Sequence, residues 1–312
     1  MPTPALDIAA GVLQRRDGQV LIARRRPGTD GAGKWEFPGG KVEPGESNRA
    51  ALDRELVEEL GIQVRQARPL LSFSHAYTHR RVNLQMWLVT DWQGEPASCE
   101  GQPLAWTAPD GLRGYDLLAA NKPIVDALRL PPQYLITPAF DGDGDAFAAR
   151  LQRCVESGVR LVRLRQPGLD DAAYTGLANQ LMNSLAGCDV SLLLDRPLNV
   201  RGAAGMHLSF EQARQVGRPD SCDGWFGVSC HNREELLSAQ GMGADFATLS
   251  PVKPTQTHPQ ARPLTWDGFT AGRTGIAMPV YALGGLTPAD LNDAWAAGAQ
   301  GIAAIRGLWP AD

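Results

Sequence analysis

Residues 40–62 read GKVEPGESNRAALDRELVEELGI. Pro44 and Gly45 predict a turn, and Ser47 is a suitable N-cap for the helix that the following residues predict. Gly61 offers a left-handed C-terminal stop. The apolar positions of this helix form a single stripe, as in a helix that packs on a core: Ala50, Ala51, Leu52, Leu56 and Leu60. The stretch therefore predicts a loop followed by an amphipathic helix.

The same helix carries three carboxylates on one face, because Glu55, Glu58 and Glu59 are spaced i, i+3 and i+4. Like charges this close repel each other, and a hard cation such as Mg²⁺ removes the penalty because it prefers carboxylate oxygens. A cation bound there polarises a phosphoryl oxygen and acidifies an attacking water. The alternative interpretation is a solvated, Glu-rich helix face, which is common in soluble proteins.

The fixed positions of the stretch resemble the Nudix box, the signature of enzymes that hydrolyse nucleoside diphosphates linked to another group. Those positions are Gly40, Glu46, Arg54, Glu55, Leu56, Glu58, Glu59, Gly61 and Ile62. Residues 8–130 also look like the MutT branch, whose members hydrolyse 8-oxo-dGTP to the monophosphate and pyrophosphate. The segments that carry this likeness, beyond the box itself, include Glu36-Phe37-Pro38-Gly39-Gly40-Lys41, Glu100-Gly101-Gln102-Pro103 and Ala120-Asn121-x-Pro123. The resemblance implies an α/β fold, with a Nudix α/β/α sandwich and a mixed sheet over residues 1–130.

The resemblance also implies a divalent metal ion, Mg²⁺ or Mn²⁺ in its place. The implied metal ligands are the Gly39 carbonyl, Glu55, Glu58, Glu59 and Glu100. Glu55 has two roles that stay open, general base or additional ligand. Arg54, grouped with the catalytic residues Glu55, Glu58 and Glu59, would act structurally by pairing with Glu46.

The nucleotide-binding residues that the resemblance implies are Arg25 at a phosphate, Phe37 and Tyr77 in the nucleoside pocket, Arg80 nearby, and Asn121 at the base edge. Each has a simpler alternative, since Arg25 belongs to a basic cluster, Phe37 fits a core and Asn121 fits a helix cap. Oxidation of guanine turns N7 from an acceptor into a donor. A buried acceptor facing N7 would therefore reject the normal base.

Five runs predict the strands of this domain: 8–14, 19–25, 34–40, 70–78 and 81–92. The first two are separated by the turn Arg16-Asp17-Gly18 and predict a β-hairpin. Residues 116–129 predict a terminal helix that is broken near Pro123.

After Pro131 and Pro132, strand-like runs alternate with helical stretches. Eight strands are predicted: 134–140, 159–166, 191–195, 205–209, 225–230, 246–252, 279–285 and 301–307. This alternation predicts a compact (βα)₈ TIM barrel over residues 131–312.

The sequence of the predicted barrel resembles those of thiamine-phosphate synthase and the related TenI group. The pieces that carry the resemblance include Arg163-Leu164-Arg165, Asp195-Arg196, Gly227-Val228-Ser229 and Ala282-Leu283-Gly284-Gly285. Pro167 stands where the resemblance expects a catalytic-site lysine, Gln212 replaces a Mg²⁺-binding aspartate, and His258 replaces another lysine. Because a pyrophosphate leaving group needs such charges, we expect a catalytically degenerate barrel that is either a binding module for a phosphorylated small molecule or a structural module. The implied phosphate contacts are Thr255, Thr257, Gly284 and Gly285.

The composition narrows the cellular setting. The 312 residues carry a net charge of −4, and neither predicted domain is net positive, so we expect a nucleotide substrate and no direct DNA binding. Five cysteines without a Cys-x-x-Cys pair favour a reducing compartment. With no signal peptide or membrane-spanning run expected, the predicted location is the cytoplasm.

The sequence thus predicts a Mg²⁺-dependent nucleoside triphosphate pyrophosphohydrolase acting on 8-oxo-dGTP, which serves nucleotide-pool sanitation and mutation avoidance. Two alternatives stay open. The hydrolase would act on a pyrophosphate of the thiamine pathway, or the barrel would sense a phosphorylated metabolite and regulate the hydrolase.

Overall fold

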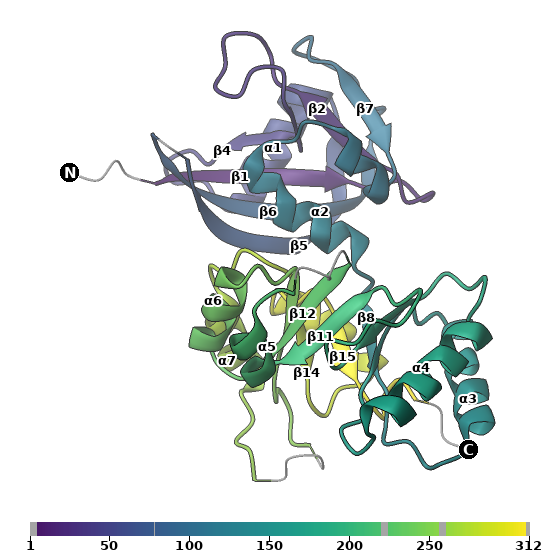
Figure 1. Cartoon of the computed structure of the whole chain (residues 1–312). Helices are drawn as coiled ribbons and strands as arrows, with labels where there is room; N and C mark the ends of the chain where they lie inside the picture. Colours follow the sequence, from purple (N-terminus) through teal and green to yellow (C-terminus); the bar gives the residue numbers. More distant parts are fainter. Residues whose placement is uncertain (1–4, 78, 220–223, 256–259, 310–312) are drawn as a thin grey trace. The chain divides into compact units, whose positions relative to one another are not determined.

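The computed structural model describes residues 5–77, 79–219, 224–255 and 260–309. The chain forms two compact units, which are described separately (Figure 1). The first comprises Met1–Arg129 with Thr274–Ala277, and the second comprises Leu130–Arg273 with Met278–Asp312. Across the described ranges, no helix is long and apolar enough to cross a membrane.

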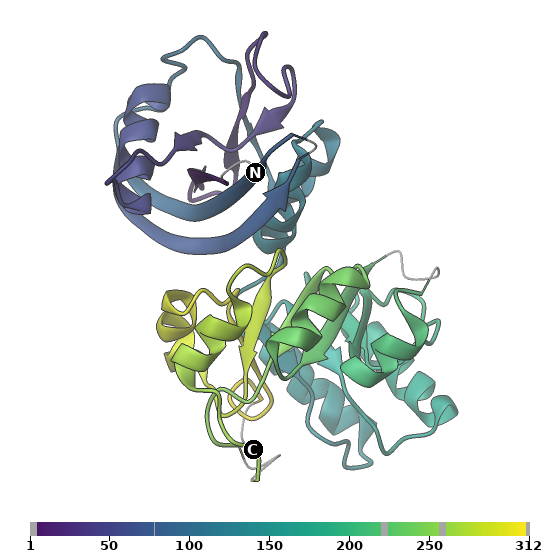
Figure 2. The same ribbon diagram turned by 90° about the vertical axis from the view of Figure 1, so that its left-hand side faces the viewer.

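The first unit contains two small sheets. The four-stranded sheet has the order β4-β1-β6-β5, and the three-stranded sheet has the order β3-β2-β7. In the larger sheet β1 runs parallel to β6, whereas the other pairs are antiparallel, so the predicted mixed sheet is confirmed. The long β5–β6 pair is strongly curved (Figure 2). The strands are β1 (Leu6–Leu13), β2 (Val20–Arg24), β3 (Trp35–Glu36), β4 (Gly39–Lys41), β5 (Gln63–Ala76), β6 (Arg81–Gln93) and β7 (Leu104–Thr107).

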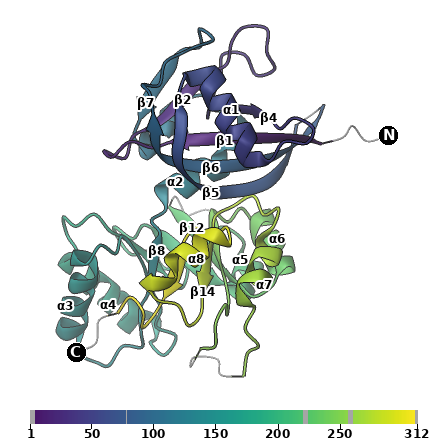
Figure 3. The same ribbon diagram turned by 180° about the vertical axis from the view of Figure 1, so that it is seen from behind.

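Two helices, α1 (Asn48–Leu60) and α2 (Lys122–Arg129), cover opposite faces of the strands (Figures 1 and 3). Alternate residues of β1 enter different cores, because successive strand side chains point to opposite faces. Ala9 and Leu13 pack in the cluster that contains the apolar stripe of α1, except for its predicted member Ala50, which is exposed. Ala10 and Val12 pack in the cluster that contains α2. This arrangement is the predicted α/β/α sandwich.

Several predicted elements of this unit were wrong in detail. The expected hairpin of 8–14 and 19–25 is reduced to one bridge, Gln14 to Val20, because β1 and β2 belong to different sheets. Strand β5 begins at Gln63, seven residues before the predicted run, and β7 had no sequence prediction. The expected helix 116–129 begins only at Lys122, after the short 3₁₀ turn η2 (Ala119–Asn121). Pro123 then lies in the first turn of α2, where a missing N–H costs nothing.

The second unit is a closed barrel of eight parallel strands in chain order, which confirms the predicted TIM barrel. All eight predicted strands are present, with shorter bounds at several ends. They are β8 (Gln133–Ile136), β9 (Leu161–Leu164), β10 (Ser191–Leu194), β11 (Gly205–Ser209), β12 (Trp225–Cys230), β13 (Phe246–Leu249), β14 (Val280–Leu283) and β15 (Ile302–Ala304).

Helices surround this barrel (Figure 3). They are α3 (Gly144–Glu156), α4 (Asp171–Ser184), α5 (Phe210–Val216), α6 (Arg233–Gly241), α7 (Thr265–Arg273) and α8 (Leu291–Ala296). A short 3₁₀ turn, η3 (Pro288–Asp290), precedes α8, and another, η1 (Pro109–Gly114), lies in the first unit. Strand residues again alternate between two environments. Leu161 packs with Tyr134 and Phe246 inside the barrel, whereas Val162 and Leu164 pack outward with α3 and α4.

Candidate functional site

The predicted caps of α1 are confirmed and position its carboxylates. The Ser47 hydroxyl accepts a hydrogen bond from the Ala50 N–H at 3.2 Å, which satisfies a free donor at the helix start. Gly61 ends the helix with a left-handed φ of 68°. Between these caps, Glu55, Glu58 and Glu59 lie on one face, as their spacing predicts.

Strand β4 lies against this face through two glycines. The Gly39 N–H donates to the Glu59 carboxylate at 3.0 Å. A Cβ at Gly39 would come within 2.4 Å of the Ala9 carbonyl oxygen, so only glycine fits there. At Gly40, a Cβ would come within 2.3 Å of the Glu55 carboxylate, which therefore occupies the space that a side chain would need. The two glycines bring the β4 backbone up to two of the carboxylates.

Arg54 connects the loop to the carboxylate face. It donates to both oxygens of Glu46 at 3.1 Å, as expected, and to the Lys41 carbonyl at 2.9 Å. It also donates to Glu55 at 2.9 Å and to Glu58 at 3.2 Å. These bonds raise the pKa of Arg54, mainly through Glu46, and the Arg54 bond lowers the pKa of Glu46. One guanidinium thus organises three glutamates.

The surroundings of Glu59 disfavour the charged form of its carboxyl group. Burial raises its pKa to about 7, although the hydrogen bond from Gly39 acts in the opposite direction. The neighbouring carboxylates Glu36, Glu55 and Glu100 raise the pKa of Glu59 further. Negative charge therefore accumulates around a half-buried carboxyl, and a cation is the natural counter-charge.

The predicted metal ligands supply the oxygen donors that Mg²⁺ or Mn²⁺ prefers, yet they are not assembled in this structure. Among the described residues, no group of three or more histidines, cysteines, aspartates or glutamates is arranged to hold a metal ion. Two of these carboxylates are engaged in ion pairs. Arg54 holds Glu58, and Arg26 holds Glu100 at 3.0 Å. The donor chemistry fits a divalent cation.

The predicted phosphate contact Arg25 is paired within the protein. Its Nη1 lies 2.6 Å from both carboxylate oxygens of Glu36, and its Nε donates to the Asp30 carbonyl at 2.6 Å. Burial raises the pKa of Glu36, although Arg25 acts in the opposite direction. Arg80 forms an ion pair with the Asp30 side chain at 2.9 Å. The Nε of Arg80 is buried without a hydrogen-bond partner in the described part of the chain, so a donor is available there.

The remaining predicted nucleoside contacts fall into two groups. Tyr77 lies near Glu36 and Arg80, and burial followed by Glu36 raises the pKa of Tyr77. Asn121 is only 5% exposed, and its amide donates to the Trp35 carbonyl at 3.5 Å. Phe37, by contrast, is 3% exposed within the hydrophobic cluster around α2, which is the simpler interpretation of this residue.

The predicted phosphate contacts of the barrel have a packing explanation. A Cβ at Gly284 would come within 2.8 Å of Pro251, and a Cβ at Gly285 within 2.5 Å of the Pro254 carbonyl oxygen. Both glycines also have positive φ, at 107° and 68°. Thr255 comes directly after Pro254 in the chain, whereas Thr257 lies outside the described residues. Close backbone packing therefore accounts for both glycines.

Three residues near the carboxylates had no predicted role. Glu36 pairs with Arg25, Arg26 pairs with Glu100, and the Gln102 amide donates to the Glu59 carbonyl at 3.3 Å. Each belongs to a stretch that resembles the MutT branch or to the basic run at 24–26. Their partners are distant in sequence or on another element, so spacing alone did not indicate these contacts.

Two family models match the chain, one on each side of the boundary between the two units near residue 130. A family model described as NUDIX domain matches residues 9–127. A family model described as thiamine monophosphate synthase matches residues 133–308, which is more than half of the chain.

Three curated proteins illustrate the similarity. The first part is 38% identical over 124 residues to an 8-oxo-dGTP diphosphatase of Escherichia coli, covering 40% of this chain and 96% of that protein. It is 40% identical over 122 residues to a CTP pyrophosphohydrolase of Escherichia coli, covering 39% and 90%. The second part is 32% identical over 197 residues to thiamine-phosphate synthase 2 of Streptococcus pneumoniae, covering 60% and 90%.

Proposed function

Because this chain belongs to the Nudix family through its first unit and to the thiamine monophosphate synthase family through its second, we propose that it is a hydrolase of phosphoanhydrides whose reaction takes place on α1. The specific reaction that we propose is hydrolysis of 8-oxo-dGTP to 8-oxo-dGMP and pyrophosphate. The observation that supports it is the group of carboxylates whose charges raise the pKa of the half-buried Glu59, beside the glycine strand β4.

A divalent cation, Mg²⁺ or Mn²⁺, is part of the proposal, held by Glu58, Glu59, Glu100 and the Gly39 carbonyl. When bound, it neutralises the triphosphate and acidifies a water molecule. Glu55 either joins these ligands or takes the proton of the attacking water. The close approach of Gly40 to Glu55 supports either role, because it fixes the position of that carboxylate.

Side chains of the first unit would orient the bound nucleotide. Glu36 and the Asp30 carbonyl hold the Arg25 guanidinium at 2.6 Å, so a substrate phosphate would meet a cation whose direction is set in advance. The unpartnered Nε of Arg80 offers a second donor at the same side. Asn121 can both donate and accept, which suits recognition of a base edge.

A second candidate substrate is CTP, and the 40% identity to a CTP pyrophosphohydrolase favours it. The two substrates differ in the size of the base and in the hydrogen bonds at its edge. A site that hydrogen-bonds one base leaves buried groups unpaired with the other, so a large preference is expected in either case.

The test is kcat/KM with 8-oxo-dGTP, dGTP and CTP in the presence of Mg²⁺, with pyrophosphate and phosphate quantified separately. Release of pyrophosphate with a preference of about 100-fold or more for 8-oxo-dGTP over dGTP supports the proposal. A preference for CTP replaces the substrate and keeps the chemistry. Release of phosphate alone contradicts the proposed cleavage.

A further inference from the structure

The loop that joins β6 to β7, residues 94–103, lies against the C-terminal end of α1. The last carbonyl groups of a helix have no partner within the helix, so other groups must satisfy them. In this chain the Ala97 N–H donates to the Leu60 carbonyl at 3.1 Å, and the Cys99 N–H donates to the Glu59 carbonyl at 3.0 Å. Two backbone hydrogen bonds therefore hold the loop on the end of the helix.

Gln102 is the buried side chain of this loop. Only 6% of it is exposed, whereas the other residues of 94–103 are exposed except for the half-buried Pro96. The amide nitrogen of Gln102 donates to the Glu59 carbonyl at 3.3 Å, and its amide oxygen accepts the Ser98 hydroxyl at 3.0 Å. A buried amide is costly unless it is hydrogen-bonded, and both ends of this amide have partners. These bonds define the position of the side chain.

Glu100 lies in the middle of the turn that Gln102 closes. The hydrogen bond from Ser98 to Gln102 joins the residues on either side of Glu100. Gly101 has a left-handed φ of 80°, which allows the chain to reverse there. The charge of Glu100 raises the pKa of Glu59, so the two carboxylates are near each other. The side chain that closes the turn is therefore bonded to the helix residue whose carboxylate is the neighbouring proposed metal ligand.

An ion pair with Arg26 is the other means of holding Glu100. The two side chains are 3.0 Å apart, and they are 50% and 38% exposed. An exposed ion pair contributes little, because water screens both charges. The hydrogen bonds of Gln102 are made by a buried group, and a buried polar group that loses its partner is costly. Gln102 is therefore the stronger constraint on the loop.

Groups that hydrogen-bond around a metal site orient its ligands, and a small hard cation such as Mg²⁺ tolerates little displacement of them. We propose that Gln102 is a positioning residue, which holds the loop so that Glu100 and Glu59 can bind the same divalent cation. This inference rests on the metal site of the proposed function and is independent of which nucleotide is hydrolysed.

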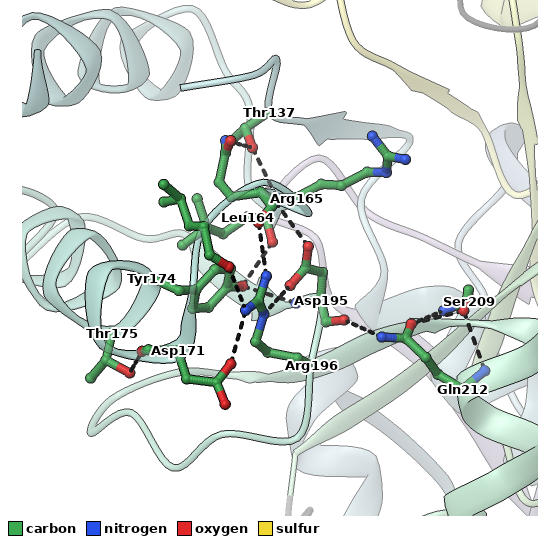
Figure 4. Close-up of polar contacts among 12 residues, drawn as sticks. Thr137, Leu164, Arg165, Asp171, Tyr174, Thr175, Asp195, Arg196, Ser209 and Gln212 are labelled. Carbon is green, nitrogen blue, oxygen red and sulfur yellow. Dashed lines mark hydrogen bonds and ion pairs between the residues drawn. The ribbon is translucent and has the colours of Figure 1, made fainter. Parts of the chain in front are cut away.

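Mn²⁺ binding by the full-length protein, followed by electron paramagnetic resonance of the free ion, tests the proposal without a substrate. Gln102→Met has a side chain of similar length and removes both hydrogen bonds. Gln212→Met in the barrel is the matched control. The Gln212 amide accepts the Ser209 hydroxyl at 2.8 Å and donates to the Asp195 carbonyl at 3.4 Å, so this variant loses the same two kinds of bond (Figure 4).

Two further variants separate positioning of Glu100 from support of α1. Ser98→Ala changes an exposed residue and removes only the bond that closes the turn. Gln102→Met is also made in the Glu100→Gln background. If Gln102 acts through Glu100, loss of its amide matters only while the Glu100 carboxylate is present. Circular dichroism checks the folding of each variant, and Ser98→Ala decides the question if Gln102→Met is unfolded.

The expected result is a Kd for Mn²⁺ that rises about tenfold or more in Gln102→Met, because a group that orients a ligand is lost. Ser98→Ala should raise it by about threefold, since one hydrogen bond is lost. Gln212→Met should leave the Kd unchanged. In the Glu100→Gln background, Gln102→Met should change the Kd by less than about twofold.

Unchanged Mn²⁺ binding in Gln102→Met and Ser98→Ala overturns the proposal, and so does an unchanged Kd in Glu100→Gln. A loss in Gln102→Met that persists in the Glu100→Gln background also overturns it, because Gln102 would then support α1 itself. The proposed function fails separately. A protein that shows the expected differences in Mn²⁺ binding and hydrolyses neither 8-oxo-dGTP nor CTP would contradict that function and support this role of Gln102.

Discussion

Arg54 and Glu46 form a two-point ion pair, with the Nε and Nη2 of the arginine each 3.1 Å from one carboxylate oxygen. The pair joins the loop before α1 to a residue in the middle of that helix. The same guanidinium reaches Glu55 and Glu58, so the loop and the carboxylate face are tied to one group. Only a planar, forked cation can make all of these contacts together.

Replacing Arg54 with lysine should therefore impair catalysis more than folding. A single ammonium cannot bridge both oxygens of Glu46 and also hold two further carboxylates, so their positions become less defined. We expect kcat to fall about tenfold or more, equivalent to about 1.4 kcal/mol. Steady-state kinetics and circular dichroism measure the two effects. Arg49→Lys is the matched control, because Arg49 lies on the same helix and forms its ion pair with Asp53, away from the three glutamates. Equal kcat in both variants would contradict this role.

The second prediction concerns Glu58, a proposed metal ligand. Glu58→Gln should lower turnover about 100-fold or more without unfolding the domain, because an amide is a poorer ligand than a carboxylate for a hard cation. A Mn²⁺ titration of the variant should show weaker binding. Glu95→Gln, at an exposed glutamate that pairs with Arg15, serves as the control. Retained activity in Glu58→Gln would remove this residue from the metal site.

The third prediction tests the space occupied by Glu55. In Gly40→Ala, the new methyl group would lie 2.3 Å from the Glu55 carboxylate, which is too close, so the Glu55 side chain must move. We expect kcat to fall about tenfold or more, with a smaller change in stability. At Gly114 a Cβ meets nothing within 4 Å, so Gly114→Ala should behave like the parent protein. Unchanged kcat in Gly40→Ala would show that the position of Glu55 is not critical.

The fourth prediction follows from the raised pKa of Glu59. Its pKa increases from 4.5 to about 7 on folding, so the folded state binds this proton more tightly than the unfolded state. The stabilisation is complete below the unfolded pKa and is lost as pH rises through about 7. Between about pH 5 and about pH 8, the metal-free parent should lose roughly 2 kcal/mol of unfolding free energy relative to Glu59→Gln.

Urea unfolding in EDTA at both pH values measures this difference. Glutamine keeps an oxygen that can accept the Gly39 N–H, so the comparison isolates the charge of Glu59. Added Mg²⁺ should restore stability to the parent mainly at the higher pH, because metal and proton compete for the same carboxylate. An identical pH response of the two proteins would mean that Glu59 titrates normally.

Local features of this chain were predictable from residues close together in sequence. The turn at Pro44, the cap at Ser47 and the stop at Gly61 depend on backbone preferences over a few residues, and the structure has the helix that they predict. The eight barrel strands were predictable because each is a short run bounded by turns. The hairpin of 8–14 and 19–25 was not, since pairing depends on which partner offers the better buried face. Strand β1 pairs with β6, more than 70 residues away.

The sequence by itself determined the chemistry that the first unit carries, because helical spacing places Glu55, Glu58 and Glu59 on one face whatever lies around them. Only the tertiary structure decided which charges are compensated. Arg25 finds Glu36, and Arg196 engages two aspartates of the barrel, while the Nε of Arg163 is buried without a hydrogen-bond partner among the described residues. The physical reason is that an ion pair depends on a distance of a few ångströms between side chains. That distance is set by how separate strands and loops pack, and not by their separation along the chain.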